Sequence, residues 1–313
     1  MTGIADCLVI GGGPAGLTAA IYLARFHLAV RVFDAGLSRA LSIPLTRNHA
    51  GYPGGIAGSD LVGRMRQQAA LYGASLLQGT IETLEKHAEG HFIALAHGAA
   101  WEARTVLLAT GVVNRRPRGL DDQTHARALA TGQLRYCPIC DGYEVTDKQV
   151  AVLGTGERGL REALFLRSFT ASLSLIAPDD VHDLTSSQRA ELEEAGVEIL
   201  GACSTMDFTG PKAVLTFADG SRAFDAVYPA LGSDIRSELA RGVGARTSEE
   251  GCLTVDAHQR TNVPGLYAAG DVVLGLDQIS HAMGEGGVAA TTIRNDLARL
   301  SPLRRAAARG PGN

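Results

Sequence analysis

Hydrophobic and polar positions follow the same order in two stretches of the chain. Each stretch has a short apolar strand, a glycine-rich turn, a helix with a periodic apolar face, and a second apolar strand. The first stretch runs from Cys7 to Phe33 and the second from Val150 to Ile176. A strand, a tight turn and a helix that leads to another strand form a βαβ unit. The pattern therefore predicts two copies of one α/β unit.

The likeness of the two stretches continues beyond the second strand. Gly73 begins a further strand in the first copy and Gly196 does so in the second, and short alternating strands follow both. Each copy then closes on a strand that ends at a glycine, Gly111 or Gly232, which lies 38 or 36 residues after the earlier one. This long repeat predicts two Rossmann-like, three-layer ββα dinucleotide-binding domains.

The residues after position 245 do not begin a third copy. They contain a strand, Leu266–Ala269, that ends in Gly270-Asp271, and a helical pattern at 278–300. The simplest topology returns this segment to the first domain, because a chain that leaves a domain by one crossover re-enters it by another. The second domain is therefore expected to be inserted in the first.

This topology sets the expected domain boundaries. The first domain is predicted to be discontinuous, with residues 1–113 and 246–313, and the second to span residues 117–243. The last stretch, residues 301–313, is rich in Arg, Ala and Gly and is expected to fray.

Composition narrows the classes of partner. The chain has 313 residues with 29 Lys and Arg against 33 Asp and Glu, so no basic field favours a nucleic acid or an anionic membrane. No run of about 18 apolar residues is present, and the first residues lack a signal-peptide pattern. We expect a cytoplasmic protein without nucleic-acid or membrane partners. Glycine is the unusual residue, at 38 of 313.

The first glycine turn has the spacing of a dinucleotide site. In such turns the first glycine makes the bend, the second lets a pyrophosphate approach the backbone, and the third allows the helix to pack on the strand. Asp34 ends the next strand 18 residues after the third glycine, where a carboxylate accepts hydrogen bonds from ribose hydroxyls. The predicted turn residues are Gly11, Gly13, Pro14, Ala15 and Gly16.

The second glycine turn has the same spacing and different neighbours. Its glycines are Gly154, Gly156 and Gly159. The position that matches Asp34 is Ala177, no Arg or Lys stands nearby to hold a 2′-phosphate, and Glu157 and Asp179 add negative charge. Three interpretations stay open: a fold that has lost its ligand, weak or NADH-preferring binding, and ordinary NADPH binding.

A cysteine pair, Cys137 and Cys140, precedes the second copy. Cysteines at i and i+3 on a helical turn share a face and are close enough for a disulfide. No second cysteine pair or histidine pair completes a zinc site, so no metal is expected and redox chemistry is favoured. The other cysteines lack partners and are expected to be buried small hydrophobic residues; they are Cys7, Cys203 and Cys252.

Thiol–disulfide exchange requires a proton for the leaving sulfur. Asp141 directly follows the cysteine pair and is the candidate donor if burial raises its pKa. Helix capping or turn hydrogen bonding is the alternative role.

Taken together, these motifs resemble those of low-molecular-weight bacterial thioredoxin reductases, which are FAD-dependent pyridine nucleotide-disulfide oxidoreductases of class II. The resemblance covers nearly the whole chain. It rests on Gly11–Gly16, Asn48–Pro53 with Gly58, Ala109–Gly111, the Cys137, Cys140 and Asp141 cluster, Ala268–Asp271, and Gln278 with Gly284, Gly286, Ala289 and Ala290.

The resemblance implies a function and a set of site residues. FAD would lie in the first domain, with Asp271 near its ribityl and phosphate groups and the backbone of Gln278 and Ile279 near the flavin ring. Cys140 would face the flavin, Cys137 would attack the substrate disulfide, and Asp141 would be the acid. The implied partner is a thioredoxin-like protein or a small dithiol or disulfide, and the implied assembly is a homodimer. The remaining implied FAD contacts are Asn48, Thr110, Gly111 and Gly270.

The chain departs from that family at places that concern its electron partner. The His-Arg-Arg type cluster for a 2′-phosphate is absent after Ile176, and Asp277 stands where the family typically has Arg. His281 lies near the expected flavin, as a helix-face residue or a proton-handling group. Atypical relatives include dithiol oxidases that pass electrons to oxygen and reductases fed by a donor other than NADPH. FAD is therefore expected, the choice between NADPH and NADH stays open, and a non-catalytic redox sensor is a further alternative.

Overall fold

A computed structural model describes residues 3–304 of the chain. The chain forms two compact units. The first contains Met1–Ser38, Val62–Gly111 and Ile235–Asn313, and the second contains Arg39–Leu61 and Val112–Asp234. Both units are discontinuous in sequence, so each is built from segments that lie far apart along the chain.

The boundaries of these units differ from the predicted domains at residues 112–113 and at two longer segments. Residues 39–61, predicted in the first domain, cluster with the second unit, because the loop they form packs beside the cysteine motif. Residues 235–243, predicted in the second domain, cluster with the first unit. The two connecting strands, β7 (Val112–Asn114) and β15 (Ser233–Ile235), pair with each other.

The first unit is built on a seven-stranded sheet of order β3-β2-β1-β6-β5-β4, with β16 also paired to β6. Pairs β1–β2, β2–β3, β1–β6 and β6–β16 are parallel, whereas β4–β5 and β5–β6 are antiparallel. The strands are β1 (Ala5–Ile10), β2 (Val30–Asp34), β3 (Ser75–Gln78), β4 (Thr83–Lys86), β5 (Phe92–Ala96), β6 (Ala99–Leu108) and β16 (Leu266–Ala268).

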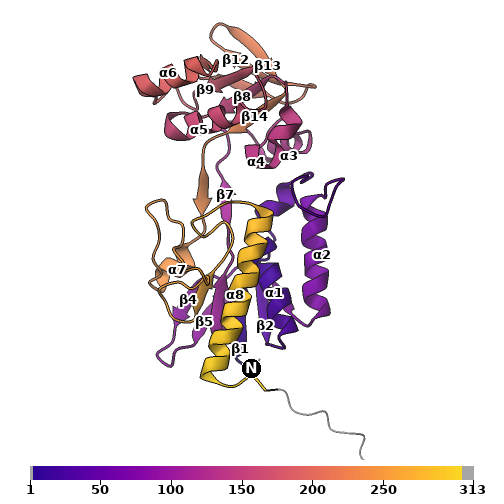
Figure 1. Cartoon of the computed structure of the whole chain (residues 1–313), viewed down its shortest axis with the longest axis vertical. Coiled ribbons are helices and arrows are strands. Elements are labelled where there is room, and N and C mark those ends of the chain that lie inside the picture. The colour runs from indigo at the N-terminus through magenta and orange to yellow at the C-terminus, as the bar shows by residue number, and fades with distance from the viewer. Residues whose placement is uncertain (1–2, 305–313) are drawn as a thin grey trace, which may run out of the picture. The chain divides into compact units, whose positions relative to one another are not determined.

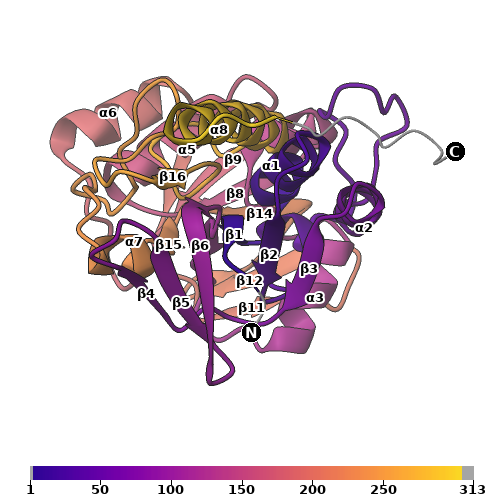
Figure 2. The same ribbon diagram turned by 90° about the horizontal axis from the view of Figure 1, so that it is seen from below.

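Helices cover one face of the parallel part of this sheet. The antiparallel strands β4 and β5 contribute side chains to the core on the opposite face. Figures 1 and 2 show α1 (Pro14–Arg25) and α8 (Ile279–Leu300) side by side on the same face. On the opposite face, Leu84 and Phe92 share a core with Leu8 of β1. Since β1 is covered on both faces, its residues Cys7–Ile10 form one continuous apolar run.

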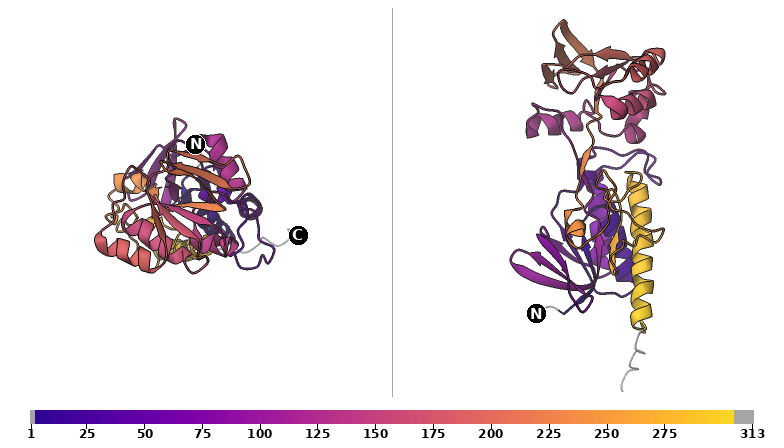
Figure 3. Two further views of the ribbon diagram at one scale, coloured as in Figure 1. Left: turned by 90° about the horizontal axis from the view of Figure 1, so that it is seen from above. Right: turned by 90° about the vertical axis from the view of Figure 1, so that its left-hand side faces the viewer.

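The remaining helices of the first unit are short or lie at its border. They are α7 (Glu238–Gly242) and α2, which spans Gly58–Leu71 and begins in residues that cluster with the second unit. The right-hand view of Figure 3 follows α8, in yellow, along the length of the sheet. The helix predicted at 278–300 is therefore present, and residues 301–304 continue without helix or strand. The rest of the predicted frayed tail lies outside the described residues.

The second unit has a four-stranded parallel sheet of order β10-β9-β8-β14 and a three-stranded antiparallel sheet of order β11-β12-β13. Its strands are β8 (Val150–Leu153), β9 (Leu173–Ile176), β10 (Glu198–Leu200), β11 (Thr205–Asp207), β12 (Ala213–Phe217), β13 (Gly220–Phe224) and β14 (Ala226–Pro229). Its helices are α3 (Asp122–Ala130), α4 (Pro138–Asp141), α5 (Gly156–Leu166) and α6 (Ser186–Glu194), with 3-10 turns at Arg39–Ser42 and Gly142–Val145.

The side chains of β8 point alternately into two cores, which lie between the three layers of the second unit. Val150 and Val152 face the core shared with α5 and α6, whereas Ala151 and Leu153 face the core shared with the antiparallel sheet. Successive side chains of a strand point to opposite faces, so an apolar residue at every position is required here. This is the three-layer ββα arrangement predicted from the sequence.

The three cysteines outside the pair differ in burial. Cys7 is fully buried in β1, as predicted. Cys203 and Cys252 are only partly buried, so the prediction of burial is wrong for both. Both lie in irregular segments between secondary-structure elements, where they are less well covered than a residue on a central strand.

Candidate active site

The cysteine pair lies at the start of a single helical turn. Cys137 is the N-cap of α4 and Pro138 is the first helical residue. The backbone N–H of Cys140 donates to the carbonyl oxygen of Cys137 at 2.9 Å and contacts its Sγ at 3.1 Å. The turn brings the two Cα atoms to 5.2 Å, and the sulfurs form a disulfide. The i, i+3 spacing thus produces the bond that the sequence predicted.

Asp141 has a hydrogen-bond donor at each carboxyl oxygen. Arg135 Nη1 lies 2.9 Å from Oδ2, and the Tyr228 hydroxyl lies 2.9 Å from Oδ1. Burial raises the pKa of Asp141, while Arg135 and the hydrogen bond from Tyr228 act in the opposite direction. A partly buried carboxyl group with a raised pKa, next to the disulfide in sequence, suits proton donation to sulfur.

Sequence reasoning missed Arg135 and Tyr228. Tyr228 lies in β14, where all four residues are buried, and its side chain is fully buried. A tyrosine in such a strand needs a partner for its hydroxyl group, which is a signal that the sequence does carry. Nothing in the sequence indicates that the partner is Asp141, 87 positions earlier.

The backbone of the first glycine turn leaves no room for side chains. A Cβ on Gly16 would overlap the carbonyl oxygen of Gly11, and a Cβ on Gly12 would overlap the Asp34 carboxylate. Gly13 is the N-cap of α1 and provides no side-chain cap. The first backbone N–H groups of α1 are thus left for a ligand, and the positive end of the helix dipole favours a phosphate there.

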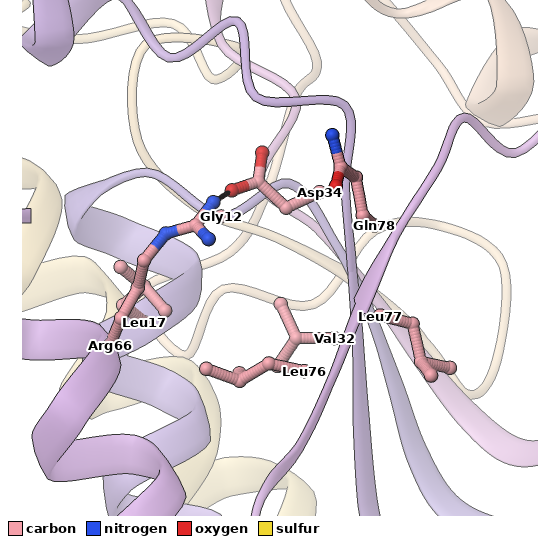
Figure 4. Close-up of a pocket in the computed structure, with 8 residues that line it drawn as sticks. All are labelled: Gly12, Leu17, Val32, Asp34, Arg66, Leu76, Leu77 and Gln78. Carbon is pink, nitrogen blue, oxygen red and sulfur yellow. Dashed lines mark ion pairs between the residues drawn. The ribbon is translucent and has the colours of Figure 1, made fainter. Parts of the chain in front are cut away.

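Asp34 lies at the carboxyl end of β2 in a pocket shown in Figure 4. Arg66 from α2 forms an ion pair with its Oδ2, and the backbone N–H of Gly36 donates to its Oδ1 at 2.8 Å. The other lining residues are Gly12, Leu17, Val32, Leu76, Leu77 and Gln78. A carboxylate beside an apolar wall suits the ribose and base of an adenine nucleotide. No pattern in the sequence indicates Arg66, which reaches Asp34 only through the fold.

Parallel pairing gathers other predicted flavin residues at one end of the sheet. β1 and β16 both pair with β6, so the segments that follow these three strands emerge together. They begin with Gly11, Ala109 and Ala269, and ligands of α/β sheets bind outside the carboxyl ends of such strands. Thr110, Gly111, Gly270 and Asp271 follow within these segments.

Contacts within the first unit fix two of these segments. The Thr110 hydroxyl donates to the carbonyl oxygen of Arg236 at 2.5 Å. The backbone N–H of Gly270 donates to Glu285 Oε2 at 2.6 Å, and Glu285 Oε1 lies 3.1 Å from His281 Nε2. His281 therefore has a partner one turn further along α8.

The last predicted flavin residues lie on two different units. Gln278 is the N-cap of α8 and Ile279 is its first residue. Asn48 belongs to the second unit, where its side-chain amide donates to the carbonyl oxygen of Ile139 in α4 at 3.3 Å. The structure therefore places Asn48 against the helix that carries the disulfide.

The second glycine turn is closed by protein groups. The Thr155 hydroxyl accepts a hydrogen bond from the backbone N–H of Asp183 at 2.7 Å, and the Asp183 carbonyl oxygen lies 3.4 Å from where a Cβ on Gly156 would be. Glu157 contacts Arg161 at 2.6 Å and Gln188 at 3.2 Å. The loop before α6 thus lies against the start of α5 and brings the Asp183 carbonyl oxygen, while α5 itself contributes the Glu157 carboxylate. Both kinds of oxygen disfavour a phosphate.

Packing alone accounts for the outer glycines of this second turn. A Cβ on Gly159 would lie 2.8 Å from the backbone of Gly154, and one on Gly154 would lie 2.8 Å from Ala230. Both glycines are therefore required for α5 to approach β8 and β14, with or without a ligand. Ala177, which takes the place of Asp34, is buried.

Comparison with known proteins agrees with this geometry. The family model described as pyridine nucleotide-disulphide oxidoreductase matches residues 5–286. The chain is 30% identical over 315 residues to a thioredoxin reductase of Streptomyces coelicolor, with 96% of each chain covered. The chain therefore belongs to the pyridine nucleotide-disulphide oxidoreductase family.

Solved structures show the same fold. A thioredoxin reductase from Streptococcus pyogenes matches with a TM-score of 0.84 at 25% identity, covering 96% of this chain and all (100%) of that one. The protein HlmI matches with a TM-score of 0.86 at 28% identity, covering 96% of this chain and 94% of that one. The predicted fold and family are confirmed, and the chain is a flavin-dependent thiol-disulfide oxidoreductase of thioredoxin reductase type.

Within residues 3–304, no helix combines the length and the apolar character needed to cross a bilayer.

Proposed function

We propose that FAD binds in the first unit with its pyrophosphate at the start of α1 and its ribose near Asp34. The observation that carries the proposal is the Asp34 carboxylate, which lies at the carboxyl end of β2 in a pocket with apolar walls, directly beside Gly12 of the glycine turn. Asp271, Gln278 and the other predicted contacts would hold the rest of the cofactor. When bound, the flavin supplies the two electrons that a disulfide needs for reduction.

We propose that Cys137, Cys140 and Asp141 carry out the thiol–disulfide exchange. The Cys137 thiolate attacks one sulfur of a substrate disulfide, the substrate S–S bond breaks, and a mixed disulfide forms. The Cys140 thiolate then attacks Cys137 Sγ and releases the second substrate sulfur. Asp141 provides a proton to one leaving sulfur and solvent provides the proton for the other, so the substrate gains two electrons and two protons while the cysteine pair becomes a disulfide. The supporting geometry is the disulfide at the start of α4 with the partly buried Asp141 directly after it.

The proposed substrate is a thioredoxin-like protein or a small disulfide, reduced by a homodimer in the cytoplasm. A second function is favoured by one observation: oxygen atoms of Glu157 and Asp183 lie at the second glycine turn, where a nicotinamide cofactor would place its phosphates. The second function is a dithiol oxidase that discharges to oxygen, or a reductase fed by a donor other than NADPH. NADPH and NADH are both proposed to bind weakly.

An anaerobic titration of the flavin absorbance separates these functions. Fast bleaching by micromolar NADPH or NADH would support the reductase and overturn weak nicotinamide binding. Bleaching by dithiothreitol, with slow bleaching by both nucleotides, would support the oxidase or the carrier-fed reductase.

A Cys140→Ser variant tests the site assignment in the same titration. We expect it to retain its flavin and to lose dithiol-driven bleaching, because the second exchange step needs the Cys140 thiolate. Unchanged bleaching by dithiol would show that the active site lies elsewhere.

A further inference from the structure

Three potential metal ligands lie in the turn that joins β4 and β5. They are His87, Glu89 and His91, and the two histidines lie directly beyond the last paired residues of the hairpin, Lys86 and Phe92. One ligand atom of each of the three residues lies within 4.8 Å of those of the other two. Imidazole and carboxylate groups are ligand types that zinc sites use. The turn therefore brings together a possible set of ligands for a metal ion.

The backbone of the turn places the two histidines opposite each other. The backbone N–H of His87 donates to the carbonyl oxygen of His91 at 2.8 Å, and that of Gly90 donates to the carbonyl oxygen of His87 at 2.9 Å. Gly90 has a φ of 92°, a left-handed conformation of the kind that closes a three-residue hairpin loop. His87 and His91 are therefore a cross-strand pair, and the Cβ atoms of such pairs are about 4.5–5.5 Å apart.

The side chains of this pair lie beside each other. The ring centroids of His87 and His91 are 4.5 Å apart, and the ring planes make an angle of 32°. Ligand atoms around a tetrahedral zinc ion are about 3.4 Å apart, since each bond to nitrogen is about 2.0–2.1 Å long. His87 and Glu89 are exposed and His91 is partly exposed. Small changes in side-chain torsion angles therefore bring the three groups to the spacing of a metal site.

One weak contact competes with a metal ion for His87. The backbone N–H of Glu89 lies 3.3 Å from His87 Nδ1, which is longer than a usual hydrogen bond in a protein. The contact directs Nδ1 toward the loop that carries Glu89. Because this N–H group is exposed, water can accept its hydrogen bond when an ion takes the nitrogen.

The hairpin below the turn is anchored in the first unit. Leu84 and Phe92 are buried in its core, and Lys86 Nζ donates to the carbonyl oxygen of Pro264 at 2.7 Å. Side chains alternate along a strand, so the two histidines lie on the face opposite that of Leu84 and Phe92. Ligands held on an anchored hairpin lose less conformational entropy when they bind an ion than ligands on a flexible segment do.

The ligand set selects the class of ion. Two imidazoles and one carboxylate suit Zn²⁺ and other late transition-metal ions, whereas Ca²⁺ and Mg²⁺ take about six or more oxygen ligands. Three protein ligands leave a fourth position for water. Glu85 lies two residues before His87 and therefore on the same face of β4, where its negative charge attracts a cation.

We propose that His87, Glu89 and His91 form a binding site for a divalent transition-metal ion, with Zn²⁺ as the expected occupant. The ion would join the two ends of the turn and stabilise the β4–β5 hairpin. The site lies in the first unit, whereas the cysteine pair lies in the second. The proposal therefore does not depend on the thiol–disulfide chemistry proposed for Cys137 and Cys140.

The test is a calorimetric titration of the oxidised, full-length flavoprotein with Zn²⁺, without an affinity tag and at about pH 7.5. In the absence of a reductant, Cys137 and Cys140 remain joined as a disulfide and do not compete for the ion. We expect one Zn²⁺ to bind per chain at micromolar concentration. Mg²⁺ at about 1 mM is expected not to bind, because the site offers a single carboxylate.

Substitutions of the ligands test which residues hold the ion. His87→Ala and His91→Ala should each weaken Zn²⁺ binding by about 100-fold or more, and Glu89→Gln by about tenfold, since even the outer partners of a metal ligand are worth about 10–100-fold. The matched controls are His258→Ala, an exposed histidine of the same unit, and Glu85→Gln, a neighbouring carboxylate outside the ligand set. Both should change the affinity by less than about threefold, because the field of an exposed charge is screened.

Hydrogen exchange provides a second readout. Zn²⁺ should slow the exchange of the His87 and Gly90 amide protons, which close the turn, in the wild type and not in His91→Ala. Unfolding midpoints measured without zinc should agree within about 2 °C, so that a loss of binding does not come from misfolding. Wild-type affinity in the His87→Ala/His91→Ala double variant would place the ion elsewhere, such as on a free cysteine, and would overturn the inference. No binding to the wild type up to about 100 μM Zn²⁺ would also overturn it.

Discussion

The two glycine turns have one spacing and opposite surroundings. In the first, Gly12 lies directly against the Asp34 carboxylate. In the second, Thr155 is bonded to the loop before α6, Glu157 is bonded to Gln188 of α6, and the position that matches Asp34 is Ala177. This difference shows that the GxGxxG motif forms a close strand-to-helix turn, while the groups around the turn determine whether a nucleotide binds.

The largest expected effect comes from filling the first turn. In Gly16→Ala the new Cβ would overlap the carbonyl oxygen of Gly11, which is backbone and has little freedom to move. We expect flavin affinity to fall by about 100-fold or more, with a loss of about 2 kcal/mol or more in unfolding free energy. Both are measured on purified protein, by FAD titration and by denaturant unfolding.

Gly63→Ala is the control for that substitution. Gly63 lies in α2 of the same unit, and a Cβ there meets nothing within 4 Å. It is expected to leave flavin content unchanged and to stabilise the helix by up to about 1 kcal/mol. Equal flavin affinity in the two variants would contradict the fit of the turn to a pyrophosphate.

Removing the carboxylate of the first turn is expected to have the next largest effect. Asp34→Asn should weaken FAD binding by about tenfold, because a charged acceptor for the ribose hydroxyls is lost. Fluorescence titration of apoprotein with FAD measures this change. Asp179→Asn removes an exposed carboxylate of the second unit and should leave FAD binding unchanged; a similar loss in both variants would argue against a specific role of Asp34.

The stability of the second unit should depend on pH through Glu162. Its pKa is raised from 4.5 to about 7 on folding, so the unfolded chain releases this proton at lower pH than the folded one. Wild-type stability is therefore expected to fall relative to Glu162→Gln as pH rises from 4.5 to about 7. The loss should be about 1–2 kcal/mol. Thermal unfolding of both proteins across this range measures the difference in stability. A difference that does not change with pH would contradict a pKa of Glu162 that is raised by burial.

The smallest effect is expected from removing charge at the second turn. Glu157→Ser takes one carboxylate away from the start of α5, which should strengthen NADPH and NADH binding by only a few-fold, since Glu157 is exposed and its field is screened. The bleaching titration measures this. An increase of about 100-fold or more would mean that Glu157 alone blocks an otherwise complete nucleotide site.

Much of the fold follows from local pattern. Residues Cys7–Ile10 of β1 and all of β8 are continuous apolar runs, and each is followed by glycines at fixed spacing and by a helix, so the duplication is visible without a structure. The boundaries were harder to predict. Residues 39–61 cluster with the second unit although they precede it by about 50 positions, since their contacts form only between distant segments.

Local sequence is enough to predict the disulfide and the carboxyl group beside it, because Cys137, Cys140 and Asp141 are close along the chain and one helical turn brings them together. The glycine turns are predictable for the same reason, since their geometry is local. The groups that surround these sites come together only in the folded chain. Arg66 reaches Asp34 from α2, and Tyr228 reaches Asp141 from a distant strand. Charge, burial and hydrogen bonding depend on all neighbours in space, and a linear pattern records only those that are near in sequence.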